Sequence, residues 1–475
     1  MRYTTVLALC TFLFSGLIVT GCGPGADTPQ PEASDSPQVE ELAVSLSDEQ
    51  IKDAVIRSYQ YVAMYNVNNK FATKQGGWGT CEADSQLKDH TMREIARPNN
   101  DTLYTACLLD LRTDAIVVNI PAFDSDYASL MITGYDHFVN IPLASRLGDF
   151  QKPETMLIYT SRTTNYVGVH VEGIDHYFEA SGDFVSVVFR VMPHFSDTER
   201  FGRIVDGMQS VNAVTLAEFR GGQPAPSVPV EFPDIGETDF DTFENNLLEV
   251  MQFVFNHTTF DPGYADDQAV LAAYRPLGVR PGQDPGTVDS AVIDGQRFRK
   301  AAEQQFNYWI TSISEMEAEM RSLIFQPKGK TSLEAVVGVS IAGPIGIPQE
   351  EAVYPQVEVV DGEQMNAMND YVIRMTAEEL PPAGAFWSLT LYDRDQGFFI
   401  PNDLKKYSVG ANSGMQLNAD GGIEIFIAVE KPEGVPEDNW LPIERGDLDL
   451  SPQLRIYVPD LEAMKTWVAP RAEKL

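Results

Sequence analysis

The densest group of chemically capable side chains runs from Arg97 to Tyr104, with the sequence Arg-Pro-Asn-Asn-Asp-Thr-Leu-Tyr. An arginine can bind a carboxylate or phosphate through two parallel hydrogen bonds. Here the neighbouring amides and the Asp101 carboxylate could orient such a group. The alternative is structural: Asn and Asp satisfy a turn, and Arg97 pairs with a buried acid. Both interpretations place the stretch at a turn that leads into an apolar strand, a common position for a site.

The six histidines do not form a metal-binding pattern. None belongs to a His-x-His, a His-Glu-x-x-His or a Cys/His zinc spacing, so no metal is predicted. His137 follows Tyr135 and Asp136 at a predicted strand end and is the one histidine to test as an acid or base. The sequence has no Gly-x-Ser-x-Gly elbow, Walker loop or dinucleotide-binding glycine motif. No cofactor and no catalytic residue are assigned.

The charge of the chain argues against nucleic acid as a partner. Its 475 residues include 34 Lys and Arg against 69 Asp and Glu, a net charge of −35. Binding to a phosphate backbone needs clustered cations, and a basic membrane-docking face is disfavoured for the same reason. Hydrophobic residues make up 43% of the chain, enough for a sizeable core.

The first 21 residues have the pattern of a bacterial signal peptide. Arg2 precedes an apolar run from Val6 to Val19 that is too short to span a membrane. The run ends in Val-Thr-Gly-Cys at 19–22, which resembles a lipobox and predicts lipidation of Cys22; the alternative is an ordinary signal peptide cleaved elsewhere. The Pro- and Ser-rich residues 22–45 predict a disordered tether. We therefore expect a lipid-anchored protein of the bacterial cell envelope, at the outer membrane facing the periplasm, with the anchor as its only membrane contact.

Of the four cysteines, two remain after Cys10 in the signal peptide and the lipidated Cys22. An oxidising envelope compartment permits a disulfide between Cys81 and Cys107. Two buried free thiols fit the sequence equally well, because Cys107 lies in an apolar strand where cysteine often serves as a small hydrophobe.

Several elements must position these residues. A helix is predicted from a capping box at Ser47 and Gln50 to about Asn69. After the Arg97 stretch the hydrophobic period changes, and short runs rich in Val, Ile, Tyr and Thr predict an antiparallel sandwich or barrel. These runs are Leu103–Leu109, Ala115–Ile120, Tyr127–Thr133, Met156–Thr160, Tyr166–Val171 and Phe184–Val191.

Helical patterns follow, at Phe240–Phe255, Asp266–Tyr274 and Val292–Phe325. The long third pattern has an apolar face that includes Phe298, Trp309 and Ile310, and we expect it to pack under the sheets. A second β-rich part is predicted by the runs Tyr371–Met375, Phe386–Tyr392, Gly422–Val429 and Gln453–Val458. The lack of alternating strands and helices argues against a Rossmann-type core.

Two blocks of the chain resemble a bacterial family that pairs two domains of unknown function, numbered 1254 and 1214. Residues 97–104, followed by Leu-Asp-Leu at 109–111, resemble the signature of the first domain. Phe-Trp-Ser-Leu-Thr-Leu-Tyr-Asp at 386–393, with Asn-Trp-Leu-Pro at 439–442 and Arg-Ile-Tyr at 455–457, resembles the signature of the second. The resemblance implies two β-rich parts with a helical insert, and no established reaction.

The predicted fold is therefore α+β, mainly β, with two β-sandwich or jelly-roll-like parts and a helical insert between them. In chain order we expect a signal peptide at 1–21, a lipidated tether at 22–45, the first resembling domain at 46–195, the insert at 196–345 and the second resembling domain at 346–475.

The leading functional hypothesis is that the protein binds or modifies a small anionic or saccharide ligand between its two β-rich parts. The candidate ligand-binding residues are Arg97, Asn99, Asn100, Asp101, Tyr104, Tyr135 and Tyr392. The alternative hypothesis is a non-catalytic envelope module that works through protein contacts.

Overall fold

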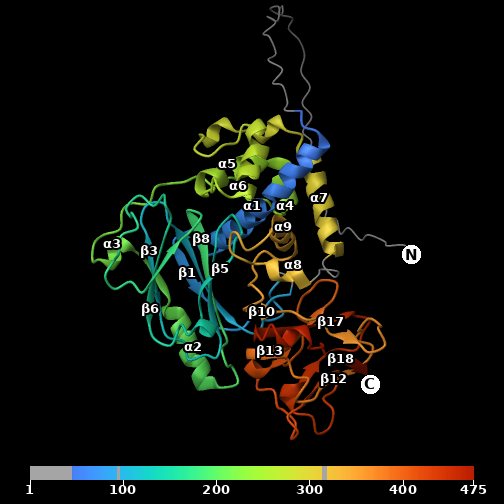
Figure 1. The fold of residues 1–475 in the computed structure, drawn as a ribbon. Coiled ribbons are helices and arrows are strands. Elements are labelled where there is room, and N and C mark those ends of the chain that lie inside the picture. The colour runs from blue at the N-terminus through green and yellow to red at the C-terminus, as the bar shows by residue number, and fades with distance from the viewer. Residues whose placement is uncertain (1–44, 94–96, 313–317) are drawn as a thin grey trace, which may run out of the picture. The chain divides into compact units, whose positions relative to one another are not determined.

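The computed structural model describes residues 45–93, 97–312 and 318–475 (Figure 1). The predicted signal peptide, Cys22 and almost all of the tether lie outside the described residues. The fold is the predicted α+β arrangement, with two β-rich parts and helices between them. Among the described residues, no helix is long and apolar enough to cross a membrane.

The first β-rich part is a sandwich of two sheets. One sheet has five strands in the order β1 (Thr80–Ala83), β2 (Leu103–Asp110), β8 (Phe184–Val191), β4 (Ala128–Thr133) and β5 (Asn140–Ala144). The other has four, in the order β7 (His176–Glu179), β6 (Glu154–Tyr159), β3 (Ile116–Ile120) and β9 (Asn212–Thr215). Helix α2 (Thr198–Ser210) adds Ile204 and Met208 to the core between the sheets, and the short α3 (Leu216–Phe219) follows β9.

The five-stranded sheet buries both of its faces, which explains why β8 is buried at every position. Successive side chains of a strand point to opposite faces. In β8, Val185, Val187, Phe189 and Val191 enter the sandwich core. On the other face, Phe184 packs into the helical core, whereas Val188 packs against residues of the second β-rich part. The outer face of this sheet is therefore covered by two different parts of the chain.

The helical part is assembled around α1 (Asp48–Lys74), which contacts α4, α5, α6, α7 and α9 (Figure 1). The bounds of the other helices are α4 Asp239–Asn245, α5 Leu247–His257, α6 Ala265–Tyr274, α7 Gly295–Ser312, α8 Ala318–Leu323 and α9 Leu333–Ala342. The predicted capping box opens α1, since Ser47 Oγ accepts a hydrogen bond from the Gln50 amide at 3.2 Å. The helix continues one turn beyond its predicted end.

The predicted packing of the long helix under the sheets is wrong. Helix α7 contacts α1, α4 and α9, so its apolar face is buried against helices. Phe298 and Trp309 lie in this helical core, but Ile310 is 45% exposed. The sequence pattern identifies an apolar face without identifying what covers it.

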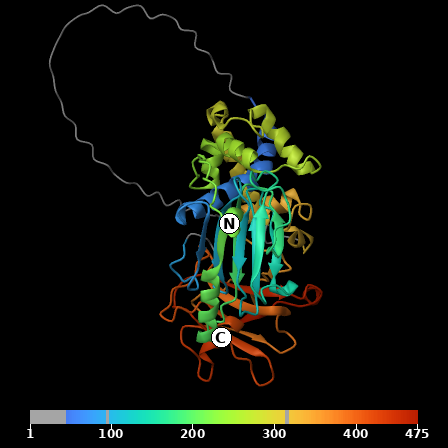
Figure 2. The same cartoon turned by 90° about the vertical axis from the view of Figure 1, so that its left-hand side faces the viewer.

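The second β-rich part is also a two-sheet sandwich, seen below the helices in both ribbon views (Figures 1 and 2). Its four-stranded sheet has the order β10 (Ala352–Val353), β17 (Leu450–Pro459), β13 (Ala383–Asp393) and β14 (Ser408–Gly410). Its five-stranded sheet has the order β11 (Glu358–Val359), β18 (Arg471–Lys474), β12 (Tyr371–Met375), β15 (Ile423–Ala428) and β16 (Trp440–Pro442). Leu389 and Ile456 from one sheet meet Ile373 and Ile425 from the other in the core.

One predicted strand is absent from the described structure. Residues 166–171 form a loop, in which the Tyr166 hydroxyl donates a hydrogen bond to the Val169 carbonyl oxygen at 2.8 Å. The apolar members of the loop, Tyr166 and Val171, cover Leu157 on the outer face of the four-stranded sheet of the first sandwich. Their burial explains why the segment has a strand-like composition.

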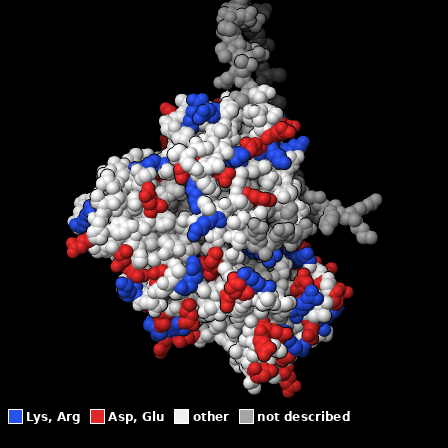
Figure 3. Space-filling view, viewed as in Figure 1, with Lys and Arg blue, Asp and Glu red and all other residues white. Residues whose placement is uncertain are grey.

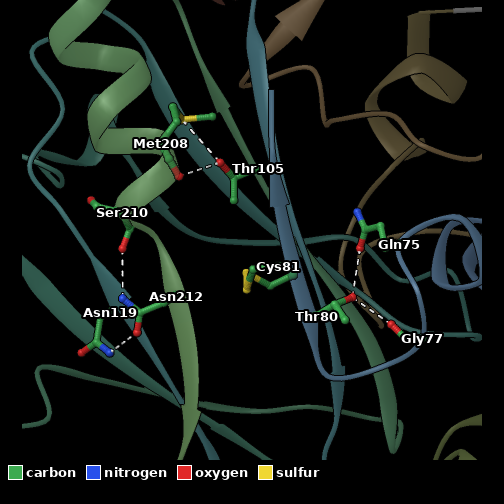
Figure 4. The surroundings of a disulfide bond; sticks show 10 residues. Gln75, Gly77, Thr80, Cys81, Thr105, Asn119, Met208, Ser210 and Asn212 are labelled. Atoms are coloured by element: carbon green, nitrogen blue, oxygen red, sulfur yellow. Dashed lines mark hydrogen bonds between the residues drawn. A yellow bond between two sulfur atoms is a disulfide. The ribbon is translucent and has the colours of Figure 1, made fainter. Parts of the chain in front are cut away.

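Cys81 and Cys107 form a disulfide that joins β1 to β2, where the two residues are directly opposite each other (Figure 4). Cys107 faces the core of the first sandwich and is fully buried. On the face drawn in Figure 3, acidic and basic side chains are interspersed. That face shows no concentration of cations of the kind that nucleic acid would require.

Candidate functional site

The Arg97–Tyr104 stretch lies where the first sandwich meets the second. It leads into β2 and packs against β13 and β17 through hydrogen bonds to its backbone. The Tyr392 hydroxyl donates to the Pro98 carbonyl oxygen at 2.5 Å, and Asn412 Nδ2 donates to the Asp101 carbonyl oxygen at 3.1 Å. The stretch and the second sandwich therefore form one interface.

Asp101 is the centre of this interface and is 1% exposed. Its Oδ2 accepts hydrogen bonds from Ser388 Oγ at 2.7 Å and from the Tyr457 hydroxyl at 3.1 Å. Arg455 Nη1 lies 3.9 Å from the same oxygen. We call Asp101, Ser388, Tyr392, Arg455 and Tyr457 the closed corner. A carboxylate from the first sandwich is contacted there by Ser388, Arg455 and Tyr457 of the second, and Tyr392 in turn contacts Arg455.

Arg455 is almost fully paired within the closed corner. It donates to Thr390 Oγ1 at 2.9 Å, to the Tyr392 hydroxyl at 2.7 Å and to the Arg97 carbonyl oxygen at 3.3 Å. Burial raises the pKa of Tyr392 to about 12, so its hydroxyl stays protonated at neutral pH. The corner thus holds a buried ion pair in which Asp101 Oδ2 accepts two hydrogen bonds, while Asp101 Oδ1 is enclosed and has no hydrogen-bond partner among the described residues.

The two asparagines serve the same junction. Asn99 Nδ2 donates to the Tyr457 hydroxyl at 3.0 Å, and its Oδ1 accepts from the Asp101 amide at 2.6 Å. Asn100 Nδ2 donates to the Lys88 carbonyl oxygen at 2.5 Å, and its Oδ1 accepts from Ser408 Oγ at 3.2 Å. Their amides therefore fix the turn and tie it to the second sandwich.

Arg97 does not join this cluster through its side chain. Residue 97 is exposed, and within the described part of the chain its guanidinium forms no hydrogen bond or ion pair. Only its backbone takes part: the amide donates to the Gly397 carbonyl oxygen at 2.6 Å. The structure thus brings together Asn99, Asn100, Asp101 and Tyr392, with Arg97 turned outward.

Tyr135 and His137 lie elsewhere, toward the helical part. The Tyr135 hydroxyl accepts a hydrogen bond from Asn69 Nδ2 at 3.1 Å, and its ring packs among helical core residues. His137 Nδ1 lies 2.7 Å from Ser340 Oγ, and Nε2 lies 2.6 Å from the Pro344 carbonyl oxygen. Burial lowers the pKa of His137 to about 4, so the ring is neutral near pH 7 and ties the turn after β4 to α9.

A second arginine at the interface, Arg190, is absent from the sequence-based candidates. It lies in the central strand β8, opposite Tyr104 on β2 and Ser129 on β4, and is 3% exposed. Its Nη1 donates a hydrogen bond to Met131 Sδ at 3.5 Å, and its Cζ lies 5.4 Å from the centre of the Tyr104 ring. The available signal was an arginine inside the Val-rich run Phe184–Val191.

Three residues lie in the electrostatic surroundings of Arg190. The Tyr104 and Tyr354 hydroxyls form no hydrogen bond with any described residue. Tyr354 is 44% exposed, and burial of its hydroxyl end raises its pKa against the opposing effect of the Arg455 and Arg190 charges. Glu351 has a fully buried side chain that accepts a hydrogen bond from Arg146. We call Tyr104, Arg190, Glu351 and Tyr354 the open corner.

A cavity of about 210 Å³ lies at the other end of the same sheet face, against the helical part. Trp78, Phe184 and Phe232 contribute to its lining, together with Asn69, the hydrogen-bond partner of Tyr135. Its lining includes no residue of the closed or open corner. Tyr135 is thus associated with a separate region of the molecule.

The family comparisons match two segments of the chain. Residues 81–211 match the model described as protein of unknown function DUF1254, and residues 351–461 match the model described as protein of unknown function DUF1214. The order of the two segments is the predicted one. Asp101 and Arg190 lie in the first segment, whereas Tyr354, Ser388 and Arg455 lie in the second, so both corners are built from the two domains together.

A solved structure shares this fold. The VPA0106 protein from Vibrio parahaemolyticus is 21% identical with a TM-score of 0.69, over 90% of this chain and 99% of that chain. An uncharacterized protein from Burkholderia cenocepacia is 12% identical with a TM-score of 0.42, over 90% of this chain and 94% of that one. No curated protein matches the sequence.

Proposed function

We propose that this chain, which belongs to the family of paired DUF1254 and DUF1214 domains, is a cell-envelope lipoprotein that binds a small anionic or saccharide ligand between its two β-rich parts. One observation carries the binding proposal. At the junction of the two sandwiches, Tyr354 reaches solvent while its hydroxyl and that of Tyr104 stay without a hydrogen-bond partner among the described residues.

Such hydroxyls are suited to ligand recognition. A tyrosine usually finds a hydrogen-bond partner for its hydroxyl, and neither of these two hydroxyls has one among the described residues. Here the two phenols lie beside buried charged groups of both signs, in a place that solvent reaches through Tyr354. A ligand with hydroxyl or anionic groups would give these phenols partners and would contact both domains at once.

The closed corner favours a second function. Because the Asp101, Asn99 and Asn100 side chains are used in joining the two sandwiches, the specific motif of the first domain has a complete structural role. A non-catalytic envelope module, in which this corner only holds the domains together, is the corresponding alternative.

A thermal-shift screen with sugars and organic acids separates the two functions. We expect a ligand to raise the melting temperature of the wild type and to shift Tyr354→Phe and Tyr104→Phe less, because each variant keeps its ring and loses the hydroxyl. Tyr308→Phe is the matched control, since Tyr308 is an exposed tyrosine on α7 at 53% exposure. Equal shifts in all four proteins would place binding elsewhere, and no shift in the wild type would support the structural module.

The envelope part of the proposal has its own test. It rests on the lipobox at Cys22 and is supported by the Cys81–Cys107 disulfide, which suits an oxidising compartment. We expect labelled palmitate to be incorporated into the wild type expressed in a bacterium and not into Cys22→Ser. Incorporation by both proteins, or by neither, would contradict lipidation at Cys22.

A further inference from the structure

We infer that Arg190 is the anion-binding residue of this protein and that its ligand carries a carboxylate. The inference rests on the proposed function, because it names the charged group of the ligand and the side chain that receives it. Its structural basis is a buried arginine whose donors have no oxygen partner among the described residues.

The strand position of Arg190 makes its burial unavoidable. In β8, Val188 and Arg190 alternate with the core-facing Val187, Phe189 and Val191 and lie on the outer face, where Val188 packs against the second sandwich. Arg190 lies between Val188 and Met192, which both pack in the apolar cluster at the interface. Burying an unpaired charge costs several kcal/mol, so a buried arginine is normally paired.

The partners of Arg190 do not meet that requirement. A guanidinium has five N–H donors, and the described residues supply one acceptor, the Met131 sulfur at 3.5 Å. A thioether is a weak acceptor. The Tyr104 ring adds a cation–π contact at 5.4 Å but accepts no hydrogen bond. By contrast, Arg455 has three oxygen acceptors and the Asp101 carboxylate.

The unused donors of Arg190 are not fully enclosed. Several buried side-chain atoms of the described residues are both enclosed and without a partner, but no Arg190 nitrogen is among them. Its remaining N–H groups therefore face space that a water molecule can reach. The charge of Arg190 acts to lower the pKa of Tyr354, which is 44% exposed.

The geometry of the guanidinium indicates the class of anion. Two parallel N–H groups of a guanidinium match the two oxygens of a carboxylate. We therefore expect a carboxylate, and inorganic phosphate, which the same donors can bind, is the comparison in the test.

Calorimetric titration of the purified full-length chain in detergent tests this inference. The probes are acetate, lactate, gluconate and benzoate, with inorganic phosphate and the neutral sugars glucose and xylose for comparison. We expect at least one carboxylate to bind more tightly than phosphate. Arg190→Met should weaken that binding at least tenfold. Arg190→Lys keeps the positive charge but cannot donate two parallel hydrogen bonds, so it should weaken the binding less.

Arg97→Met is the matched control, because it removes the exposed arginine of the same interface. Equal carboxylate affinity in Arg190→Met and wild type, or a loss seen only in Arg97→Met, would overturn the inference. Binding of the sugars without any carboxylate would overturn it and leave the proposed function standing. Tighter binding of phosphate than of every carboxylate would overturn the assigned class, and binding of no probe to the wild type would contradict both proposals.

Discussion

The closed and open corners contain the same kinds of residue, an arginine, a carboxylate and tyrosines, at one interface. In the closed corner, Arg455 and Asp101 have partners from both sandwiches. In the open corner, Arg190 contacts a sulfur and a ring, and the hydroxyls of Tyr104 and Tyr354 are unpaired within the described residues. The difference shows that a dense run of polar residues in a sequence can form the interface between two domains. Here the side chains without hydrogen-bond partners lie next to that run and not within it.

This contrast has an energetic consequence. Removing one partner of a buried, hydrogen-bonded ion pair leaves the other charge without compensation and is strongly destabilising. Replacing a buried charge that was never well paired with an apolar side chain of similar volume is neutral or stabilising. Substitutions in the two corners should therefore change the free energy of unfolding in different directions.

The largest loss is expected for Asp101→Ala in the closed corner. This change leaves Arg455, which is 4% exposed, without its carboxylate and removes an acceptor from two hydroxyls. We expect the free energy of unfolding, measured with urea at pH 7, to fall by about 3–5 kcal/mol. A loss below 1 kcal/mol would mean that the corner does not hold the domains together.

A smaller loss is expected for Ser388→Ala, which removes one donor to the same carboxylate. The Ser388 Oγ lies 2.7 Å from Asp101 Oδ2 within a fully buried environment. A hydrogen bond to a charged group contributes about 1.5–3 kcal/mol, and urea unfolding should show a loss in that range. In a double-mutant cycle with Asp101→Ala, additive effects would indicate that the two side chains do not interact in solution.

The parts of the fold that follow local rules were predictable from the sequence. The capping box at Ser47 begins α1, and the runs at Leu103–Leu109 and Phe184–Val191 are strands. Apolar patterns do not identify their partners, which is why the α7 packing was wrong and why the buried loop at Tyr166–Val171 has the composition of a strand.

The site was only partly predictable for a related reason. The motif identified Asp101 and Asn99, but the side chains that bind them lie more than 280 residues further along the chain. Arg190 lies within a Val-rich strand, where its sequence neighbours give no indication of what it faces. Only the packing of the second sandwich distinguishes the paired arginine from the unpaired one.

In the open corner, Glu351 should make stability depend on pH. Burial raises the pKa of Glu351 above its usual value of 4.5, so folding favours the protonated acid. The stabilisation from the protonated acid is complete below the pKa that Glu351 has in the unfolded chain. It is lost as the pH rises through the higher pKa that Glu351 has in the folded protein. Relative to Glu351→Gln, the wild type should lose unfolding free energy as the pH rises from about 4 to about 8. A relative gain over this range would contradict the assigned direction.

The smallest effect is expected for Arg97→Ala. The Arg97 side chain is exposed and, among the described residues, has no hydrogen bond or ion pair, while its backbone contacts survive the substitution. We expect the free energy of unfolding to change by about 0.5 kcal/mol or less. A loss comparable to that of Asp101→Ala would show that Arg97 belongs to the closed corner after all.

The most direct measurement compares Arg190→Met with Arg455→Met in urea unfolding at pH 7, without added ligand. Both substitutions replace an almost fully buried guanidinium at one interface with an apolar side chain. We predict that Arg455→Met loses about 3–5 kcal/mol and that Arg190→Met loses nothing or becomes more stable. A loss of similar size in both variants would show that both arginines are paired within the protein and that neither is left for a ligand.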